Sequence, residues 1–459
     1  MLQDLMQNPK PFGGKTIVFS GDYQQTLPIM EHMSEERVLR HVAKNAKVFR
    51  DHAQIHTLVV NMRVKLRAQE LRQARGTQDR ATARRRLEDQ RRYSEFTKKM
   101  GTGTLPTPAC RNIPDDFVEV PSDICLAREE NDVQQTRGRG KINADSAKPL
   151  LDFVFPSFVK KHRSRVYLRG RAILAPRNDT TFAINDLCLD LVPGEERTYL
   201  STDTVAEATA GDDMRYAPTT EFLNQMVTPN GFPHHKVRLK VGALVMVLRS
   251  IRGEPRLVNG TRCIVTDLHD TCIEADIVGG TYDGEPVIIH TIPLIQDRDF
   301  GITTFAVKRT QLPIRLSWAM TINKVRPITR VMRMHTLGVA ARSDTKGFTR
   351  HSFPHTPHLK TMHRRLPPHS LSTSQNIVPS HSHPASYPTR QSQGQTLQQV
   401  GLYFQSQCFS HGQCYVAFSR VGSFSQIRVM VDDDGAYVDP DHPDKVFIRN
   451  RVQRSVLNA

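Results

Sequence analysis

A stretch of 67 residues, 325–391, has a composition that cannot form part of a hydrophobic core. It holds ten Lys or Arg and one acid, Asp344, together with eight of the 19 His of the chain, eight Pro and eight Ser. No sustained period of 3.6 or 2 runs through it, so it indicates neither an amphipathic helix nor a half-buried strand. We therefore expect a disordered insertion. The irregular spacing of its His disfavours a metal-binding tract.

The remaining charge bounds the class of protein. The chain has 63 Lys or Arg and 46 Asp or Glu, a net charge of +17; without 325–391, which carries +9, the other 392 residues hold +8. A positive field suits a polyanion partner, although a merely basic soluble protein has the same composition. No apolar run approaches the ~18 residues of a membrane span. We see no secretory signal, and the seven Cys contain no Cys-x-x-Cys pair, which favours a reducing compartment.

Short apolar runs outside this segment predict an α/β fold. Residues 16–20 (TIVFS) and 171–175 (RAILA) are typical of buried strands, and residues 426–431 (QIRVMV) predict a late one. After the second run, Asn178 is a candidate helix cap, and residues 182–191 have helical apolar spacing.

The middle of the chain has a different pattern. Residues 237–248 alternate between apolar and polar side chains, and Asn259-Gly260 is a hairpin-type turn before another apolar run at Cys263. This block predicts a small all-β unit inserted into the α/β domain.

A second charged run, 65–92, contains ten basic and four acidic residues, no Pro and one Gly. It predicts a solvated helix, and a phosphate-contacting face is the alternative.

A different feature, Gly14-Lys15-Thr16, resembles the tail of a phosphate-binding P-loop. The first Gly of that motif would fall on Pro9, and a strand is expected after the triplet where a P-loop requires a helix. We therefore reject a P-loop here.

Four segments, in this order, resemble motifs III to VI of the Pif family of superfamily-one DNA helicases, which includes the helicase part of Helitron-type transposons. Shorter matches occur at 93–96, 171–204 and 221–265. The four segments are residues 12–29 (FGGKTIVFSGDYQQTLPI), 58–63 (LVVNMR), 318–324 (WAMTINK) resuming at 392–397 (SQGQTL), and 412–421 (GQCYVAFSRV).

This resemblance implies an α/β fold made of a partial first RecA-like lobe and a second RecA-like lobe carrying a small β-barrel insert. The implied boundaries are 1–54 for the tail of the first lobe, 55–190 for the first part of the second, 191–300 for the barrel region, and 301–324 with 392–459 for the completion of the second lobe. It also implies an ATP-dependent DNA helicase, moving 5′ to 3′ on single-stranded DNA, with ATP and Mg²⁺ as cofactors and single strands or duplex junctions as partners. The family location is intracellular, nuclear or mitochondrial, with roles in DNA repair and recombination.

The resemblance assigns roles to individual residues. Gln25 would sense the γ-phosphate, because its amide both donates and accepts hydrogen bonds. Arg63 and Arg420 stand at the arginine-finger positions, where a planar charged fork suits phosphate oxygens; surface ion pairing is the alternative. Five residues would lie beside the single strand and contact its phosphates: Thr321, Lys324, Ser392, Gln393 and Gly394.

Two departures from the family pattern lead to further expectations. The family places its P-loop Lys and the acidic pair that holds Mg²⁺ upstream of motif III, and only eleven residues precede Phe12 here. We therefore expect a C-terminal fragment that is inactive alone, and a non-catalytic nucleic-acid-binding remnant is the alternative. The family also joins Lys324 directly to Ser392. Every Val codon begins with GT, and CAG is one of the codons of Gln, so our hypothesis from codon logic is that 325–391 is a retained intron.

Overall fold

The computed structural model describes residues 2–18, 21–26, 51–106, 113–126, 144–206, 218–225, 228, 231–296, 306–322, 397–432, 437–439 and 442–457. The chain divides into two compact units, and 2–18 is the described part of the first. This part holds α1 (Leu2–Leu5) and the 3₁₀ helix η1 (Pro11–Gly14). Apart from residues 16–18, which are considered at the end of this subsection, everything below concerns the second unit. The predicted insertion, 325–391, lies outside the described residues.

A parallel four-stranded sheet forms the centre of the α/β part. Its order is β13 (Ala319–Thr321), β2 (Arg171–Ala175), β14 (Gln399–Phe404) and β15 (Ile427–Val431), and every neighbouring pair is parallel. The sheet is covered on both faces, which is why its strands appear in the sequence as continuous apolar runs. Alternate residues of one strand therefore enter different cores, as Ala172 and Ile173 do.

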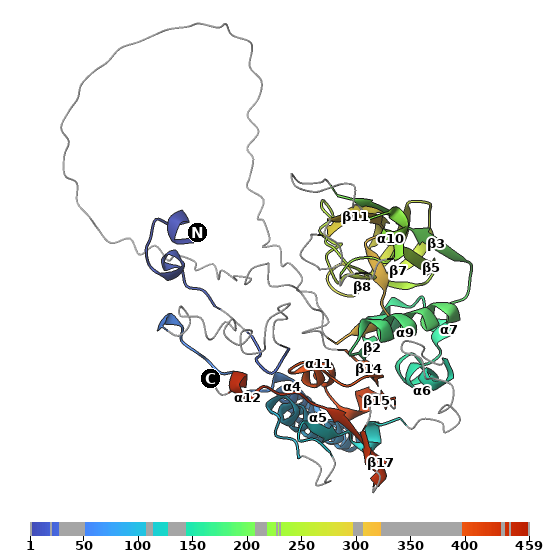
Figure 1. Ribbon diagram of the computed structural model, residues 1–459. Helices are drawn as coiled ribbons and strands as arrows, with labels where there is room; N and C mark the ends of the chain where they lie inside the picture. The colour runs from blue at the N-terminus through green and yellow to red at the C-terminus, as the bar shows by residue number, and fades with distance from the viewer. Residues whose placement is uncertain are drawn as a thin grey trace, which may run out of the picture. The chain divides into compact units, whose positions relative to one another are not determined.

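Helices cover the two faces of this sheet (Figure 1). On one face lie α6 (Ala144–Val154) and α9 (Asn178–Leu191), whose Leu150 and Ile184 share a core with Ile173. On the other face lie α5 (Thr77–Thr102) and α11 (Gln413–Phe418), whose Tyr93 and Phe418 join the second core. α4 (Met62–Gln73) packs against α5.

The central block forms antiparallel sheets around a core that it shares with α6 and α9. Described strands form three sheets here, and no pairing among them closes a barrel. The first has the order β12 (Ile314–Leu316), β6 (Leu244–Val247), β7 (Arg262–Leu268), β8 (Cys272–Val278) and β9 (Pro286–His290). The second is β10 (Ile292–Gln296), β11 (Val307–Gln311) and β4 (Thr202–Val205), and the third is β3 (Glu196–Leu200) with β5 (Lys236–Lys240). α10 (Thr220–Gln225) packs against β4.

Smaller elements complete the unit. An antiparallel sheet has the order β1 (Phe117–Glu119), β17 (His442–Arg449) and β16 (Tyr437–Asp439). The short helices are η3 (Ser122–Ile124), α7 (Phe158–Lys161), α8 (Arg165–Arg169), η7 (Phe424–Gln426) and α12 (Arg454–Leu457). Among the described residues, no helix has the length and apolar character to cross a membrane.

The sequence predicted several of these elements, with local differences. The strands β2 and β15 and the helix α9 are confirmed. Asn259-Gly260 lies in a turn, but not in the expected hairpin-type turn: of the two residues only Gly260 has a positive φ, 93°, and the connection between the paired strands β6 and β7 runs over residues 248–261. Asn178 is not the cap: Arg177 occupies that position, and the Asp179 carboxylate accepts from the Thr180 N–H at 2.8 Å.

Three expected elements differ because glycine or missing neighbours interrupt them. The run 65–92 forms two helices that break before Gly76, and 237–248 forms β5 and β6 on either side of Gly242, which has φ 92°. The buried strand expected at 16–20 is wrong over its described part, 16–18: only Val18 makes a β-bridge and it is 51% exposed. A buried parallel strand needs neighbours on both sides, and no described sheet includes this segment.

Candidate functional site

The turn at residues 21–26 is organised by Asp22. The Gln24 N–H donates to Asp22 Oδ1 at 3.0 Å, and the Gln25 N–H donates to the Asp22 carbonyl oxygen at 3.2 Å. The Gln25 side chain donates from Nε2 to Asp22 Oδ2 at 3.2 Å. An Asp that accepts from the amide two residues on forms an Asx turn. Gln25 is therefore held by its own backbone turn and by the same carboxylate.

The loop before α11, and α11 itself, bind this turn. The Tyr415 hydroxyl donates to Asp22 Oδ2 at 3.0 Å. His411 Nδ1 accepts from the Gln453 N–H at 2.8 Å, so the neutral ring carries its proton on Nε2. That Nε2–H donates to the Tyr23 carbonyl oxygen at 2.9 Å. Hydrogen bonds from two residues thus attach the turn to the start of α11.

Gly412 allows the two backbones to meet. It has φ 68°, and a Cβ placed there would lie 2.2 Å from the Gln24 carbonyl oxygen and 2.9 Å from the Gln25 carbonyl carbon. Any side chain at 412 would therefore displace the turn. Glycine is required both by the left-handed backbone and by this close approach.

Arg420 lies just beyond α11, and its side chain is buried, with 3% exposure. Its Nε donates to the Val416 carbonyl oxygen at 2.8 Å, and Nη2 donates to Ser419 Oγ at 3.1 Å. Burial, with a smaller contribution from the neighbouring Arg63, lowers the pKa of Arg420 to about 10, while Tyr415 and Asp22 oppose the shift. Arg420 therefore remains a cation at neutral pH, at an energetic cost from its burial.

Arg63 reaches the same place from α4. Asn61 caps this helix, since its Oδ1 accepts from the N–H groups of Arg63 at 3.0 Å and Val64 at 3.3 Å. Arg63 Nη1 donates to the carbonyl oxygens of Ser419 at 3.3 Å and Val421 at 3.1 Å, on either side of Arg420. The structure thus brings together Gln25, Arg63 and Arg420 from three separate segments.

The electrostatics of this cluster favour an anion. Two guanidinium groups, Arg63 and Arg420, lie within electrostatic range of each other, and among the described residues the carboxylate of Asp22 acts on Arg420. Burial, together with the charge and hydrogen bond of Asp22, raises the pKa of Tyr415, so its phenol stays neutral. The charges of Arg63, Arg420 and Asp22 sum to +1, and a negatively charged phosphate oxygen would offset this charge.

These residues do not fit a metal ion. Among the described residues, no three His, Cys, Asp or Glu side chains converge into a group that could hold one. The Arg63–Arg420 cluster has the chemistry of an anion site, while Mg²⁺ finds no ligand set in the described part of the chain.

The predicted single-strand residues fall mostly outside the described structure. Lys324, Ser392, Gln393 and Gly394 are not described. Thr321 is the last residue of β13, level with Ala175 of β2, and is 6% exposed. It therefore ends at the carboxyl edge of the parallel sheet, where ligands bind in open α/β sheets.

Hydrogen bonds connect this carboxyl edge to α11. Thr180 Oγ1 donates to Gln405 Oε1 at 2.8 Å, which joins the segments that follow β2 and β14. Gln413 of α11 donates from Nε2 to the Pro176 carbonyl oxygen at 3.4 Å. Side-chain hydrogen bonds thus link the carboxyl edge of the sheet, where Thr321 lies, to α11, the helix that precedes Arg420.

Four residues of the cluster were missed by the sequence reasoning: Asp22, His411, Gly412 and Tyr415. All lie in or next to the segments 12–29 and 412–421, so the signal was present as an acidic residue after a run of small and apolar side chains and a Gly before a helix. Their spacing along the chain did not show that the two segments touch.

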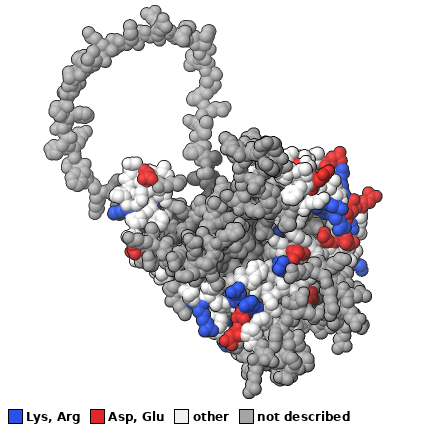
Figure 2. All heavy atoms as spheres, viewed as in Figure 1, with Lys and Arg blue, Asp and Glu red and all other residues white. Residues whose placement is uncertain are grey.

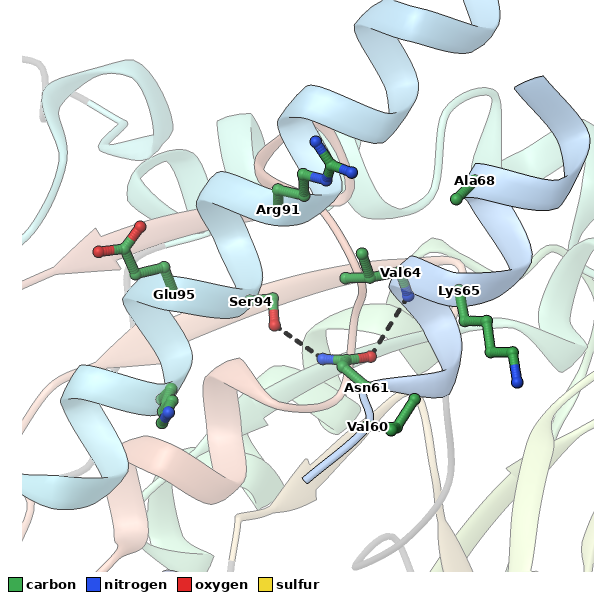
Figure 3. Close-up of a pocket in the computed structure, with 9 residues that line it drawn as sticks. Val60, Asn61, Val64, Lys65, Ala68, Arg91, Ser94 and Glu95 are labelled. Carbon is green, nitrogen blue, oxygen red and sulfur yellow. Dashed lines mark hydrogen bonds between the residues drawn. The ribbon is translucent and has the colours of Figure 1, made fainter. Parts of the chain in front are cut away.

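A groove runs between α4 and α5 next to this cluster (Figure 3). Its volume is about 430 Å³, and Asn61 crosses its floor by donating from Nδ2 to Ser94 Oγ at 2.7 Å. The remaining lining residues are Val60, Val64, Lys65, Ala68, Arg91, Glu95 and Lys98.

Two known sequence families match parts of the chain. The family described as PIF1-like helicase matches residues 1–108, and the family described as DNA helicase Pif1, 2B domain, matches residues 221–268. Over these two segments the chain matches the Pif1-like helicase family, including its 2B domain. The first match spans the Asp22 turn and Arg63, and the 2B match covers most of α10 together with β5, β6 and β7.

Solved Pif1 structures are similar to the chain at low identity. The Pif1 helicase of Candida albicans is 17% identical with a TM-score of 0.48, over 99% of this chain and 70% of that one. Bacteroides Pif1 bound to single-stranded DNA is 15% identical with a TM-score of 0.44, over 93% of this chain and 65% of that one. A Bacteroides Pif1 with ADP-AlF3 and single-stranded DNA is 14% identical with a TM-score of 0.42, over 93% and 65%. No curated protein matches the chain.

Proposed function

We propose that this chain supplies the second RecA-like lobe of a Pif1-like, ATP-dependent DNA helicase that moves 5′ to 3′ on single strands. Arg63 and Arg420 act on the γ-phosphate, Gln25 reports its presence, and the carboxyl edge of the parallel sheet holds the DNA strand. The observation that carries the proposal is the convergence of Gln25, Arg63 and Arg420 around Asp22 and Tyr415. Boundaries at 54, 190, 300, 324 and 392, and closure of the β region into a barrel, belong to the same proposal.

The chemistry of the site follows from charge. ATP supplies a γ-phosphoryl group whose transfer is aided mainly by positioning and by cations placed around it. Arg420 is already charged and largely desolvated, so its attraction to a phosphate oxygen is stronger than that of an exposed arginine. To reach an oxygen it exchanges its bonds to Val416 and Ser419. Arg63 is exposed, and to reach an oxygen it exchanges its contacts with the carbonyl oxygens of Ser419 and Val421.

The 459-residue chain by itself is expected not to hydrolyse ATP. It contains no Gly-x-x-x-x-Gly-Lys-[Ser/Thr] sequence, and the described residues offer no acidic metal site. Purified protein is assayed with Mg-ATP and single-stranded DNA. DNA-stimulated turnover of ~1 s⁻¹ or more, in the usual enzyme range, would contradict this expectation. Single-strand binding without turnover is shared with the alternative, a non-catalytic nucleic-acid-binding protein.

A fusion of this chain with the ATP-binding lobe of a Pif1 helicase allows ATP turnover and DNA binding to be measured separately. In the fusion, Arg420→Ala is expected to lower turnover ~10³–10⁵-fold, the usual effect of losing an arginine finger. Its affinity for single-stranded DNA stays nearly unchanged. Arg451→Ala is the control, because it removes a nearby cation that donates to the Phe409 carbonyl oxygen at 3.0 Å. If Arg420→Ala loses DNA affinity and keeps its turnover per bound strand, the assignment to the ATP site is wrong.

Lys324→Ala is expected to do the opposite. It weakens DNA binding and reduces the slope of log K against log salt by about one phosphate contact. Turnover at saturating DNA should stay close to that of the unaltered fusion. If the fusion hydrolyses no ATP even when Arg420 and Lys324 are both unaltered, the result would favour the non-catalytic alternative.

A further inference from the structure

The positive charge of the chain is concentrated in two segments. Residues 62–102, which contain α4 and α5, hold 13 Lys or Arg and five Asp or Glu, a net of +8. The segment 325–391 carries +9, so the remaining residues sum to zero out of the total of +17. Figure 2 shows acidic and basic side chains mixed over the described surface on the face in view. The α4–α5 hairpin therefore carries the whole positive excess of the chain outside 325–391.

Much of this hairpin makes no contribution to a core. No residue of α4 is buried, and the buried residues of α5 begin only at Leu87. From there Gln90 donates to the Gly422 carbonyl oxygen after α11, and Tyr93 OH donates to the carbonyl oxygen of Phe418, the last residue of α11, at 2.6 Å. The first ten residues of α5, 77–86, therefore extend beyond the part of the helix whose side chains are buried.

The cations of the hairpin are largely unpaired. Within it, Arg67 pairs with Glu70 and Lys99 pairs with Glu95. Nine others make no ion pair with any described residue: Lys65, Arg72, Arg75, Arg80, Arg84, Arg85, Arg86, Arg91 and Lys98. A helix that is merely solvated gains from alternating i to i+4 pairs, and like charges at that spacing destabilise it. The unpaired set therefore costs stability and needs another explanation.

The unpaired cations also line up along the helix. Arg84, Arg91 and Lys98 follow one another at seven-residue intervals, which places them on one face at steps of ~10.5 Å. Arg91 and Lys98 of α5 line the groove, and Lys65 lines it from α4; Figure 3 shows Arg91 and Lys65 on the two helices. The row thus continues from the groove onto the extended part of α5, where Arg85 and Arg86 add to Arg84.

We propose that the α4–α5 hairpin binds the phosphate backbone of duplex DNA, as a contact separate from the single-strand site; this rests on the proposed function. Single-strand sites combine cations with exposed aromatic rings on which bases stack. The aromatic residues of the hairpin are Tyr93, which is buried, and Phe96, which is partly buried. A straight row of cations without stacking rings fits the regular charge of a duplex, one per ~1.7 Å of its axis. The hairpin would hold the duplex ahead of the separated strand without reading sequence.

The test removes three exposed charges at the projecting end of the row. In the full 459-residue protein, Arg84, Arg85 and Arg86 are replaced together by Gln, which keeps helix propensity. Binding to a blunt 20-base-pair duplex and to a dT20 strand is measured across a salt series. The slope for the duplex is expected to fall by roughly 2–3, since each lost phosphate contact contributes ~0.9. The slope for dT20 should stay the same.

The matched control replaces Lys160, Lys161 and Arg163, also exposed, by Gln, and should leave both slopes unchanged. An equal loss in this control would mean that net charge alone acts, and would overturn the proposal. So would a wild-type chain that does not bind the duplex, or a triple-Arg variant that loses binding to phosphatidylserine vesicles and keeps duplex binding. If any of these results is found and the wild-type chain still binds dT20, only the duplex proposal fails and the proposed function stands. If the wild-type chain does not bind dT20, the proposed function itself is contradicted.

Discussion

Arg309 and Asp203 form an ion pair in the β region whose side chains are 1% and 0% exposed. Arg309 donates from Nε to Asp203 Oδ1 at 2.8 Å, and its remaining nitrogens reach the carbonyl oxygens of Pro233 at 3.0 Å and Leu223 at 3.1 Å. Ser201 Oγ also donates to Asp203 Oδ1, at 2.7 Å. Because each partner would otherwise be a buried charge, this pair should determine how β4, β11 and α10 are joined.

Asp203→Ala should therefore destabilise the protein by ~3–5 kcal/mol, the usual effect of leaving a buried charge unpaired. The control is Asp270→Ala, which removes the partner of Arg197 at the surface, where the two side chains are 41% and 91% exposed. That loss should cost about 1 kcal/mol or less. The single Trp of the chain, Trp318, lies in the core shared with the β region and reports urea unfolding by fluorescence. Equal shifts in the two variants would contradict the prediction.

Single residues show how far the sequence alone could reach. Gln25, Arg63 and Arg420 could be named from motifs, and the structure places them in one cluster, although their roles remain predictions. Asp22 and Tyr415 could not be found in this way, because the hydrogen bond between them joins positions 393 residues apart. A motif shows which residue types are present; the contact that gives Asp22 its place appears only in three dimensions.

At the scale of elements, apolar runs were more informative than charged ones. Strands such as β2 and β15 lie in a sheet that is covered on both faces, and this burial requires a nearly continuous run of apolar residues that is visible in the sequence. The run 65–92 was harder to interpret, because a charged helix with one buried stripe leaves few apolar positions to count. The break before Gly76 and the turn at Gly242 reflect backbone conformation, which hydrophobic periodicity does not encode.

The contact between the 21–26 turn and the start of α11 can be tested through Gly412. Gly412→Ala would force a residue with a Cβ into φ 68° and place that Cβ 2.2 Å from the Gln24 carbonyl oxygen. We expect faster amide hydrogen exchange over residues 22–26, in addition to ~1–3 kcal/mol of backbone strain. Gly253→Ala is the control, because Gly253 has φ 85° and nothing within 4 Å of the added Cβ. It carries the strain without the collision, so unchanged exchange at 22–26 in both variants would refute the role of the contact.

At the scale of the whole molecule, the described ends of the interruption lie on the same sheet. β13 and β14 both pair with β2, one on each side, and Thr321 is level with Ala175 while Gln399 is level with Arg171. The lateral separation is two strand spacings, about 10 Å, and the offset along the strands is four residues, about 13 Å. A connection must therefore cover roughly 16 Å and cross one face of the sheet.

Deleting 325–391 leaves ten residues, 322–324 and 392–398, between Thr321 and Gln399. Ten residues reach about 33 Å when extended, which is twice the separation and leaves room for a right-handed crossover. We therefore expect the shortened chain to keep the parallel sheet and to unfold at a higher urea concentration, because the long loop no longer has to be closed. Limited proteolysis of the full chain should cut first within 325–391, and the shortened chain should lack that cleavage. Protection of 325–391 from protease, or loss of the Trp318 unfolding transition after deletion, would show that the segment is a folded part of the protein.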